Sequence, residues 1–158
     1  MIAALLSTLA LLAGPGLIEG PAKDSGPVPN PSLTPAEVVQ IQLDALRLND
    51  KPGKDAGIAT AFRFASPGNR EATGPLENFN RIVRGPGYLP MIDHRIAGTG
   101  PIVVVGGVAV QRATVVAKDG RAIEYEFRLS KDPASGCWFT DGVLPVVPPR
   151  PTDKGVLS

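Results

Sequence analysis

The sequence predicts an α+β fold, in which three N-terminal helices pack on one face of an antiparallel sheet of four to five strands. Apolar residues recur at helical spacing from residue 35 to about residue 84, and after Tyr88 they recur at every second position. Two dipeptides, Gly106-Gly107 and Asp119-Gly120, separate consecutive strand candidates, and turns this short join antiparallel neighbours. Helices followed by a strand meander are typical of a fold whose helices cover one sheet face.

The first helix is predicted from about residue 35 to residue 49. Thr34, Pro35 and Glu37 form a capping-box sequence with proline at the first helical position. The segment Lys51 to Lys54 contains Pro and Gly and ends the helix. The residues expected near its apolar face are Val38, Ile41 or Gln42, Ala45, Leu46, and Leu48 or Asn49.

Two shorter helices are predicted after the first. Asp55 is expected to cap a helix that buries Ile58 and Phe62, and the turn-forming residues 66–69 are expected to end it. The third helix runs from about 75 to 84, because Pro75 suits its first position and Gly85-Pro86 terminates it.

Five segments with a period of two are predicted as strands. The clearest is 122–130, in which Tyr125 and Phe127 belong to an apolar series that alternates with polar residues. One face of this strand is therefore expected to be buried and the other exposed. The five predicted segments are residues 91–98, 101–105, 108–117, 121–130 and 136–143.

The ends of the chain differ from its middle. Ile2 to Ala13 is uncharged and apolar, which is too short for a transmembrane helix and suits the core of a secretory signal. We expect a signal peptide over residues 1–22, cleaved after Ala22, and export to the periplasm or the medium; an uncleaved N-terminal anchor is the alternative. Residues 23–33 are expected to form a tether rich in Pro and Gly, residues 34–144 a single domain, and residues 145–158 a Pro-rich tail.

The composition excludes several classes of function. The 158 residues suit one domain, and 43% hydrophobic residues are enough to form a core. A formal net charge of +1, with basic residues scattered singly, speaks against binding to nucleic acid. One cysteine and one histidine exclude an intramolecular disulfide and the usual structural zinc sites. We expect no metal, no cofactor and no membrane contact beyond the N-terminal segment.

Short stretches along most of the domain resemble a known family. They are Gln42-Leu43-Asp44-Ala45, Asp55-Ala56-Gly57-Ile58, Phe64-Ala65-Ser66-Pro67-Gly68-Asn69, Thr73-Gly74-Pro75-Leu76 with Phe79, Tyr88 with Met91 and His94, and Cys137-Trp138-Phe139-Thr140-Asp141. On these stretches the run from Val38 to Val143 resembles the bacterial and plastid family called domain of unknown function 4864. The resemblance implies a cone-like (cystatin-like) fold, similar to nuclear transport factor 2, with three helices on a curved sheet. It implies no activity.

His94 is the candidate for a catalytic residue. In Ile92-Asp93-His94-Arg95-Ile96 it shares a predicted strand face with two isoleucines, so it is expected to point toward the helices. There an imidazole can act as a general base, as the cone-fold resemblance implies for isomerases and dehydratases. The alternative is a buried neutral histidine held by one hydrogen bond. Cys137 is the one nucleophile that His94 could activate, and a small core residue is the alternative for it.

Three hypotheses about function follow. The first is a binding or structural module with a pocket for a small apolar ligand, lined by candidates Phe64, Tyr88, His94, Tyr125 and Trp138. The second is an isomerase or lyase that uses a pocket centred on His94. The third is a protein-interaction domain that forms a homodimer through its exposed sheet face.

Overall fold

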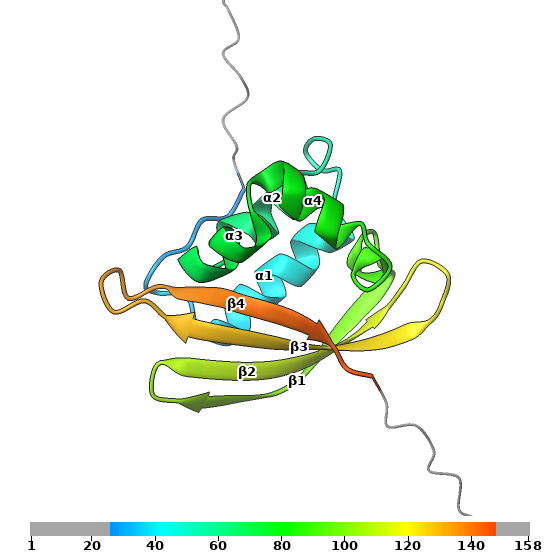
Figure 1. Cartoon of the computed structure of the whole chain (residues 1–158). Helices are drawn as coiled ribbons and strands as arrows, with labels where there is room; N and C mark the ends of the chain where they lie inside the picture. The colour runs from blue at the N-terminus through cyan, green and yellow to red at the C-terminus, as the bar shows by residue number, and fades with distance from the viewer. Residues whose placement is uncertain (1–25, 148–158) are drawn as a thin grey trace, which may run out of the picture.

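A computed structural model describes residues 26–147, and these residues form a layer of helices on one side of a twisted sheet (Figure 1). The predicted signal peptide, residues 23–25 of the tether and residues 148–158 of the tail lie outside the described residues. The sheet order is β1-β2-β3-β4, and all neighbours are antiparallel. The predicted α+β class is thus confirmed. The elements are α1 (Pro35–Arg47), α2 (Ala56–Arg63), α3 (Pro67–Thr73), α4 (Leu76–Val83), the 3-10 helix η1 (Leu89–Met91), β1 (Ile96–Val105), β2 (Val108–Val116), β3 (Ala122–Lys131) and β4 (Trp138–Pro145).

Helix α1 forms as its sequence predicts. The Glu37 amide donates to the Thr34 hydroxyl at 3.3 Å, and the Thr34 amide donates to the Glu37 carboxylate at 2.7 Å, which completes the capping box. Its buried face carries Val39, Leu43 and Leu46. Among the described helices none has the length and apolar character needed to cross a membrane.

The structure has a fourth α-helix where the sequence predicts a turn. Residues 66–69 do not merely end α2. Ser66 begins α3, because its hydroxyl accepts a hydrogen bond from the Asn69 amide at 3.2 Å and Pro67 occupies the first helical position. Ser-Pro-Gly-Asn suits both a turn and a helix start, and the local sequence does not separate the two.

The prediction of two separate strands at 91–98 and 101–105 is wrong, because the structure has a single strand there. Residues 91–95 complete η1 and a bend in which Asp93 has a φ of 52°, and β1 then runs without a break from Ile96 to Val105. A bulge between Thr99 and Ile102 accommodates Gly100 and Pro101, which the sequence suggests as a strand boundary. Gln111 Nε2 donates to the Gly100 carbonyl at 2.9 Å and so satisfies a group that the bulge withdraws from the ladder.

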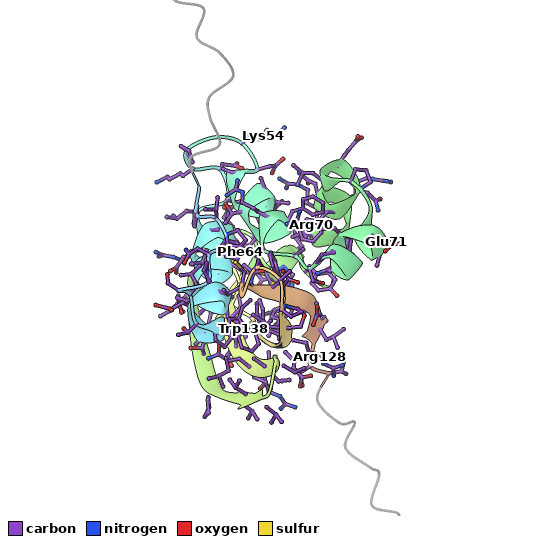
Figure 2. All side chains as sticks on the ribbon, turned by 90° about the vertical axis from the view of Figure 1, so that its left-hand side faces the viewer. Lys54, Phe64, Arg70, Glu71, Arg128 and Trp138 are labelled. Atoms are coloured by element: carbon purple, nitrogen blue, oxygen red, sulfur yellow. The ribbon has the colours of Figure 1, made fainter. Side chains whose placement is uncertain are left out.

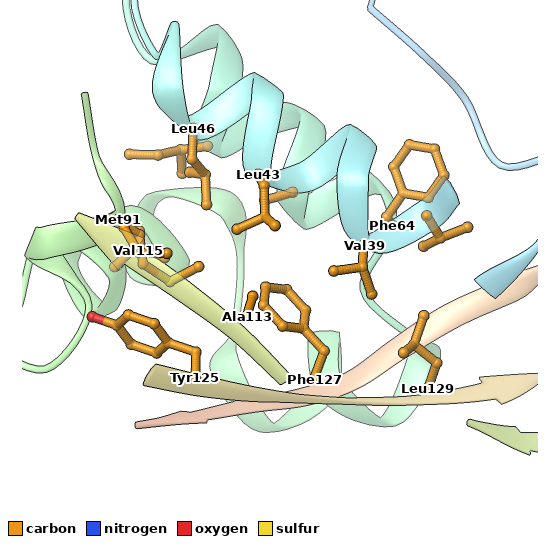
Figure 3. Close-up of a cluster of buried hydrophobic side chains, with 14 of the residues drawn as sticks. Val39, Leu43, Leu46, Phe64, Met91, Ala113, Val115, Tyr125, Phe127 and Leu129 are labelled. Atoms are coloured by element: carbon orange, nitrogen blue, oxygen red, sulfur yellow. The ribbon is translucent and has the colours of Figure 1, made fainter. Parts of the chain in front are cut away.

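The core lies between α1, α2 and the inner face of the sheet. Tyr125, Phe127 and Leu129 alternate along β3 and are buried, as predicted, and the face that carries them lies under α1 (Figure 3). Phe64 and Trp138 lie in the interior of the domain, whereas Lys54 and Glu71 are exposed (Figure 2). Burial of the apolar side chains in this core is the main favourable contribution to stability.

The two edges of the sheet differ. Beside β4, the Thr140 amide donates to the Phe64 carbonyl at 2.8 Å, and the Ser66 amide donates to the Thr140 carbonyl at 2.9 Å. The segment between α2 and α3 therefore covers this edge. No element within residues 26–147 pairs with the outer edge of β1.

Candidate ligand-binding pocket

A pocket of about 100 Å³ lies between the helices and the β4 side of the sheet. Every helix contributes to its wall, together with β3 and β4. Its apolar lining consists of Leu46, Ala61, Phe79, Ile82, Val83, Met91, Phe127 and Val143. Its polar lining consists of Gln42, Asn69, Thr73, Tyr88 and Thr140. Among the described residues, no charged side chain lines the pocket, so it is a neutral and mostly apolar site.

Helix α4 forms the roof of the pocket. Its Phe79 ring lies 5.2 Å from the Phe62 ring of α2, with the two rings tilted against each other. Of the eight α4 residues only Val83 is buried, and Ile82 remains 38% exposed although it lines the pocket. A concave site lined mainly by apolar side chains with a few polar groups is typical of small-molecule binding.

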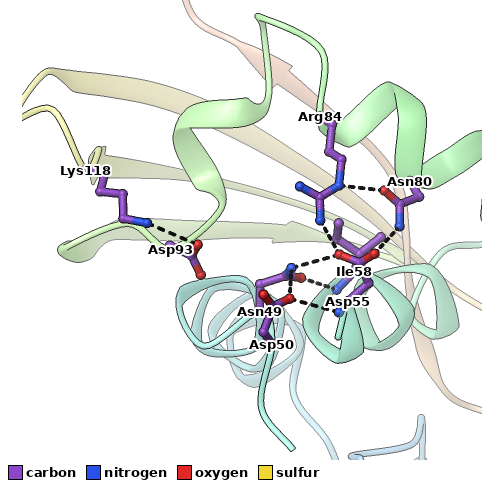
Figure 4. Close-up of polar contacts among 8 residues, drawn as sticks. All are labelled: Asn49, Asp50, Asp55, Ile58, Asn80, Arg84, Asp93 and Lys118. Atoms are coloured by element: carbon purple, nitrogen blue, oxygen red, sulfur yellow. Dashed lines mark hydrogen bonds and ion pairs between the residues drawn. The ribbon is translucent and has the colours of Figure 1, made fainter. Parts of the chain in front are cut away.

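A polar cluster anchors α4 in this position (Figure 4). The Asp55 carboxylate accepts hydrogen bonds from Asn80 at 2.9 Å and from Asn49 at 3.1 Å, and it forms an ion pair with Arg84. The hydrogen bond from Asn80, followed by those from Asn49 and Arg84, holds the pKa of Asp55 below its usual value although burial opposes this. Asp55 thus joins the end of α1 and the start of α2 to α4.

The role of Asp55 differs from the predicted helix cap. Asp55 occupies the N-cap position of α2 with a φ of 60°, but its side chain makes no capping bond. Asn49 does that instead, because its Oδ1 accepts from the Ile58 amide at 3.0 Å. The sequence analysis gives Asn49 only as an alternative to Leu48 near the apolar face of the first helix.

Two polar side chains of the pocket are almost completely buried. Gln42 on α1 is 3% exposed and Thr140 on β4 is 2% exposed. Gln42 Nε2 donates to the Thr140 hydroxyl at 2.8 Å and to the Val38 carbonyl at 3.0 Å. Asn69 Nδ2 donates to the Thr140 carbonyl at 3.0 Å. These contacts gather Gln42, Asn69 and Thr140 into one polar part of the wall.

Tyr88 closes the pocket near η1. Its hydroxyl donates to the Val143 carbonyl at 2.9 Å, and the Tyr125 hydroxyl donates to the Gly87 carbonyl at 2.9 Å. The two rings stack with 6.4 Å between centroids. Burial, and then the neighbouring Tyr88, raises the pKa of Tyr125 to about 12, so Tyr125 is neutral at physiological pH. Both hydroxyls fasten the loop after α4 to the sheet.

The sequence of this domain matches the family model named Domain of unknown function (DUF4864) over residues 32–152. The chain belongs to the DUF4864 family. Searches of curated proteins and of solved structures gave no match. The family resemblance inferred from the sequence is therefore confirmed, whereas the cone-like likeness remains a prediction.

Of the predicted pocket residues of this DUF4864 domain, only Tyr88 lines the pocket. Phe64 and Tyr125 are completely buried in the core, and Trp138 is 8% exposed at the start of β4. The large aromatic side chains of Phe64, Tyr125 and Trp138 fill the space around their own positions, so no room for a ligand remains there. The pocket forms instead beside smaller residues such as Ala61 and Gly142.

His94 is buried, as predicted, but for a different reason. It lies in the bend after η1 and not on a strand, and Ile96, which was expected on the same face, is 63% exposed. His94 Nδ1 lies 2.8 Å from the Met91 carbonyl oxygen, and because a carbonyl only accepts, Nδ1 carries the proton. His94 is not part of the pocket wall.

Cys137 is a free, buried cysteine at the turn before β4. Its Sγ lies 3.8 Å from the Ser135 carbonyl oxygen, and no contact within the described structure joins it to His94. Across residues 26–147, His, Cys, Asp and Glu side chains form no group of three that could hold a metal ion.

Gln42 and Thr140 are the two most deeply buried polar residues of the DUF4864 pocket, and the sequence analysis proposes neither as a pocket residue. A signal exists for Gln42, because an amide on the apolar face of a helix must find partners when the helix packs. Thr140 carries no such signal. Its position depends on how β4 pairs with β3, and a bulge between Arg128 and Leu129 shifts that register.

Proposed function

We propose that this DUF4864 domain binds a small, neutral, mostly apolar molecule and does not transform it. The observation that carries the proposal is the chemistry of the pocket wall. Tyr88 is its one titratable side chain within the described residues, and its hydroxyl is committed to the Val143 carbonyl. Such a wall offers a ligand apolar contact and a few hydrogen bonds, and its described residues include no general base that could activate the threonine hydroxyls.

The size of the pocket limits the ligand. A dry apolar cavity of roughly 150 Å³ holds benzene. The pocket of about 100 Å³ is smaller but opens to solvent beside Ile82, which favours a ring or a short branched chain with one end outside. The alternative of an isomerase or lyase centred on His94 receives no support, because His94 lies outside the pocket wall.

The test is an NMR titration of the ¹⁵N-labelled protein with toluene. We expect toluene to shift the amide signals of residues around Ala61 and Val83. Ala61→Phe places a ring in the pocket and should abolish these shifts. Ala59→Phe, on the same helix but outside the pocket wall, is the matched control and should leave them unchanged. Thermal unfolding of each variant establishes that it folds. The proposal fails if toluene leaves the wild-type spectrum unchanged, or if both variants respond as the wild type does.

A second candidate function is self-association through the outer face of the sheet. The register pairs Val103 with Val110 and Val105 with Val108, which brings four valines together beside the open edge of β1. Val105 is 74% exposed and Val103 62%. Exposed apolar surface of this kind is typical of interaction sites.

We favour a second copy of the chain as the partner on this face. Strand β1 carries no charge, and the outer-face Arg112 and Arg128 already form ion pairs with Glu124 and Glu126. Two such faces therefore meet without repulsion. Sedimentation over a concentration series should detect a dimer that Val105→Lys prevents. A wild-type chain that stays monomeric throughout would contradict this candidate.

We also propose that the protein is exported, on the uncharged apolar run from Ile2 to Ala13. Mass spectrometry of the protein from its own host should find a chain that begins after Ala22. A soluble chain with Met1 intact would exclude cleavage.

A further inference from the structure

We infer that the ligand carries one neutral polar group, a hydroxyl or a carboxamide, that contacts Gln42 Oε1 and the Thr140 hydroxyl. This inference rests on the proposed function and adds the chemical class of the ligand to it. It begins from two polar atoms of the pocket wall that the protein itself does not use.

The first atom is Oε1 of Gln42. The orientation of this amide is fixed, because the Val38 carbonyl accepts a hydrogen bond from Nε2 and cannot donate one. With both Nε2 protons donated, to Val38 and to Thr140, Oε1 is left without a hydrogen bond from any described residue. Gln42 Oε1 is also not completely buried. Within the described residues, the only completely buried side-chain oxygen or nitrogen without a hydrogen-bond partner is Oε1 of Gln111. Gln42 is 3% exposed and lines the pocket, so the pocket is where Oε1 is reached.

The second atom is the hydroxyl proton of Thr140. The Thr140 oxygen accepts from Gln42 Nε2, and its own proton goes to no acceptor in residues 26–147. The backbone of Thr140 is fully used, since its amide donates to Phe64 and its carbonyl accepts from Ser66 and Asn69. Thr140 is therefore held rigidly, with a free donor next to the free acceptor of Gln42.

An acceptor and a donor side by side match a ligand group that both donates and accepts. A hydroxyl or a carboxamide does this with one group. A carboxylate has no proton to give to Gln42, and an ammonium group cannot accept from Thr140. Either charge would also be desolvated in a wall without an opposite charge, which is costly. The adjoining side chains Leu46, Phe79 and Phe127 then contact the apolar body.

The experiment compares two probes that differ by one hydroxyl, toluene and benzyl alcohol. Dissociation constants are measured by NMR titration on the wild type and on Gln42→Met, which keeps the length of the side chain but not its oxygen. We expect Gln42→Met to weaken benzyl alcohol about tenfold, as the loss of one well-formed hydrogen bond predicts, and to leave toluene within about twofold.

Thr140→Val is the second variant, in case Gln42→Met does not fold. It removes the hydroxyl at constant shape and should weaken benzyl alcohol selectively in the same way. Thr114→Val, on the exposed outer face of β2, is the matched control and should change neither probe.

The outcomes separate the two proposals. If neither probe binds the wild type, the proposed function fails and this inference fails with it. If toluene binds but benzyl alcohol loses no more affinity than toluene in either pocket variant, the pocket stands and the polar contact is wrong. A selective loss of benzyl alcohol, in Gln42→Met or in Thr140→Val, supports the contact.

Discussion

Gln42 shows how one side chain connects the core of this domain to its pocket. It lies on the buried face of α1 among aliphatic residues, where an amide is expensive unless its hydrogen bonds are made. Two of them are made within the protein, to Val38 and to Thr140. The remaining oxygen is reached from the pocket, where another molecule can supply a donor.

Tyr125 gives a prediction about alkaline pH. Burial, and then Tyr88, raises its pKa from 10.0 to about 12. The folded state therefore binds more protons than the unfolded chain between these values. The contribution of Tyr125 to the free energy of unfolding is therefore fully present below about pH 10 and is lost as the pH rises toward 12. Tyr125→Phe should remove this fall, and at pH 7 it should cost about 1–2 kcal/mol because the Gly87 carbonyl loses its donor.

Urea unfolding of the wild type and of Tyr125→Phe at neutral pH and above pH 10 measures both effects. An equal loss of stability in the two proteins above pH 10 would show that Tyr125 does not titrate as its surroundings require.

At the scale of elements, α1 and α2 pack very closely at Gly57. A Cβ atom on Gly57 would lie 2.1 Å from the backbone oxygen of Ala45, and the backbone cannot move aside as a flexible side chain can. The glycine thus allows α2 to approach α1 and bring Ile58 into the core.

Gly57→Ala should therefore lower the free energy of unfolding by about 3 kcal/mol, at the upper end of the usual cost of overpacking. Gly53→Ala is the control, since a Cβ there meets nothing within 4 Å. Chemical denaturation of both variants gives the comparison. Equal midpoints would mean that the two helices can separate freely.

The elements predicted well from the sequence are those with a single local signal. The capping box fixed the start of α1, and the alternation of β3 identified which face is buried. Prediction failed where one signal fits two structures, as with Ser66-Pro67-Gly68-Asn69, which starts α3, and Gly100-Pro101, which forms a bulge inside β1.

The site was harder to predict than the fold. All five candidate residues were aromatic or imidazole groups whose size suits a core as well as a pocket. Gln42 and Thr140 are 98 residues apart, and nothing local in either segment indicates that they meet. Their contact follows from the register of β4, which is a property of the whole sheet.

At the scale of the whole molecule, several carboxylates respond alike to acid. Hydrogen bonds hold the pKa values of Asp55, Glu126 and Asp132 below their usual range, with Asn80, Arg128 and Ser135 as the respective largest causes. Groups with a lowered folded pKa stabilise the protein above their unfolded pKa, near 4, and this contribution is lost as the pH falls further.

We therefore expect the urea midpoint of the wild type to decrease below about pH 4. Asp55→Asn should be less stable than the wild type at pH 7 and should show a shallower decrease in acid. Glu77→Gln, on the same helix as Asn80 but bonded to no member of the cluster in the described structure, should follow the wild-type curve. A decrease in Asp55→Asn as steep as in the wild type would show that Asp55 is not one of the groups responsible.

The covered edge of β4 has a consequence for the order in which the chain can fold. Thr140 belongs to the last strand, yet its backbone bonds to Phe64 and Ser66, and its side chain bonds to Gln42. On the ribosome the segment around Ala65 is made about 75 residues before Thr140, its partner in the sheet. Contacts so distant along the chain are formed late and slow folding. We therefore expect the helices and the sheet to reach their native packing together, when the last strand pairs.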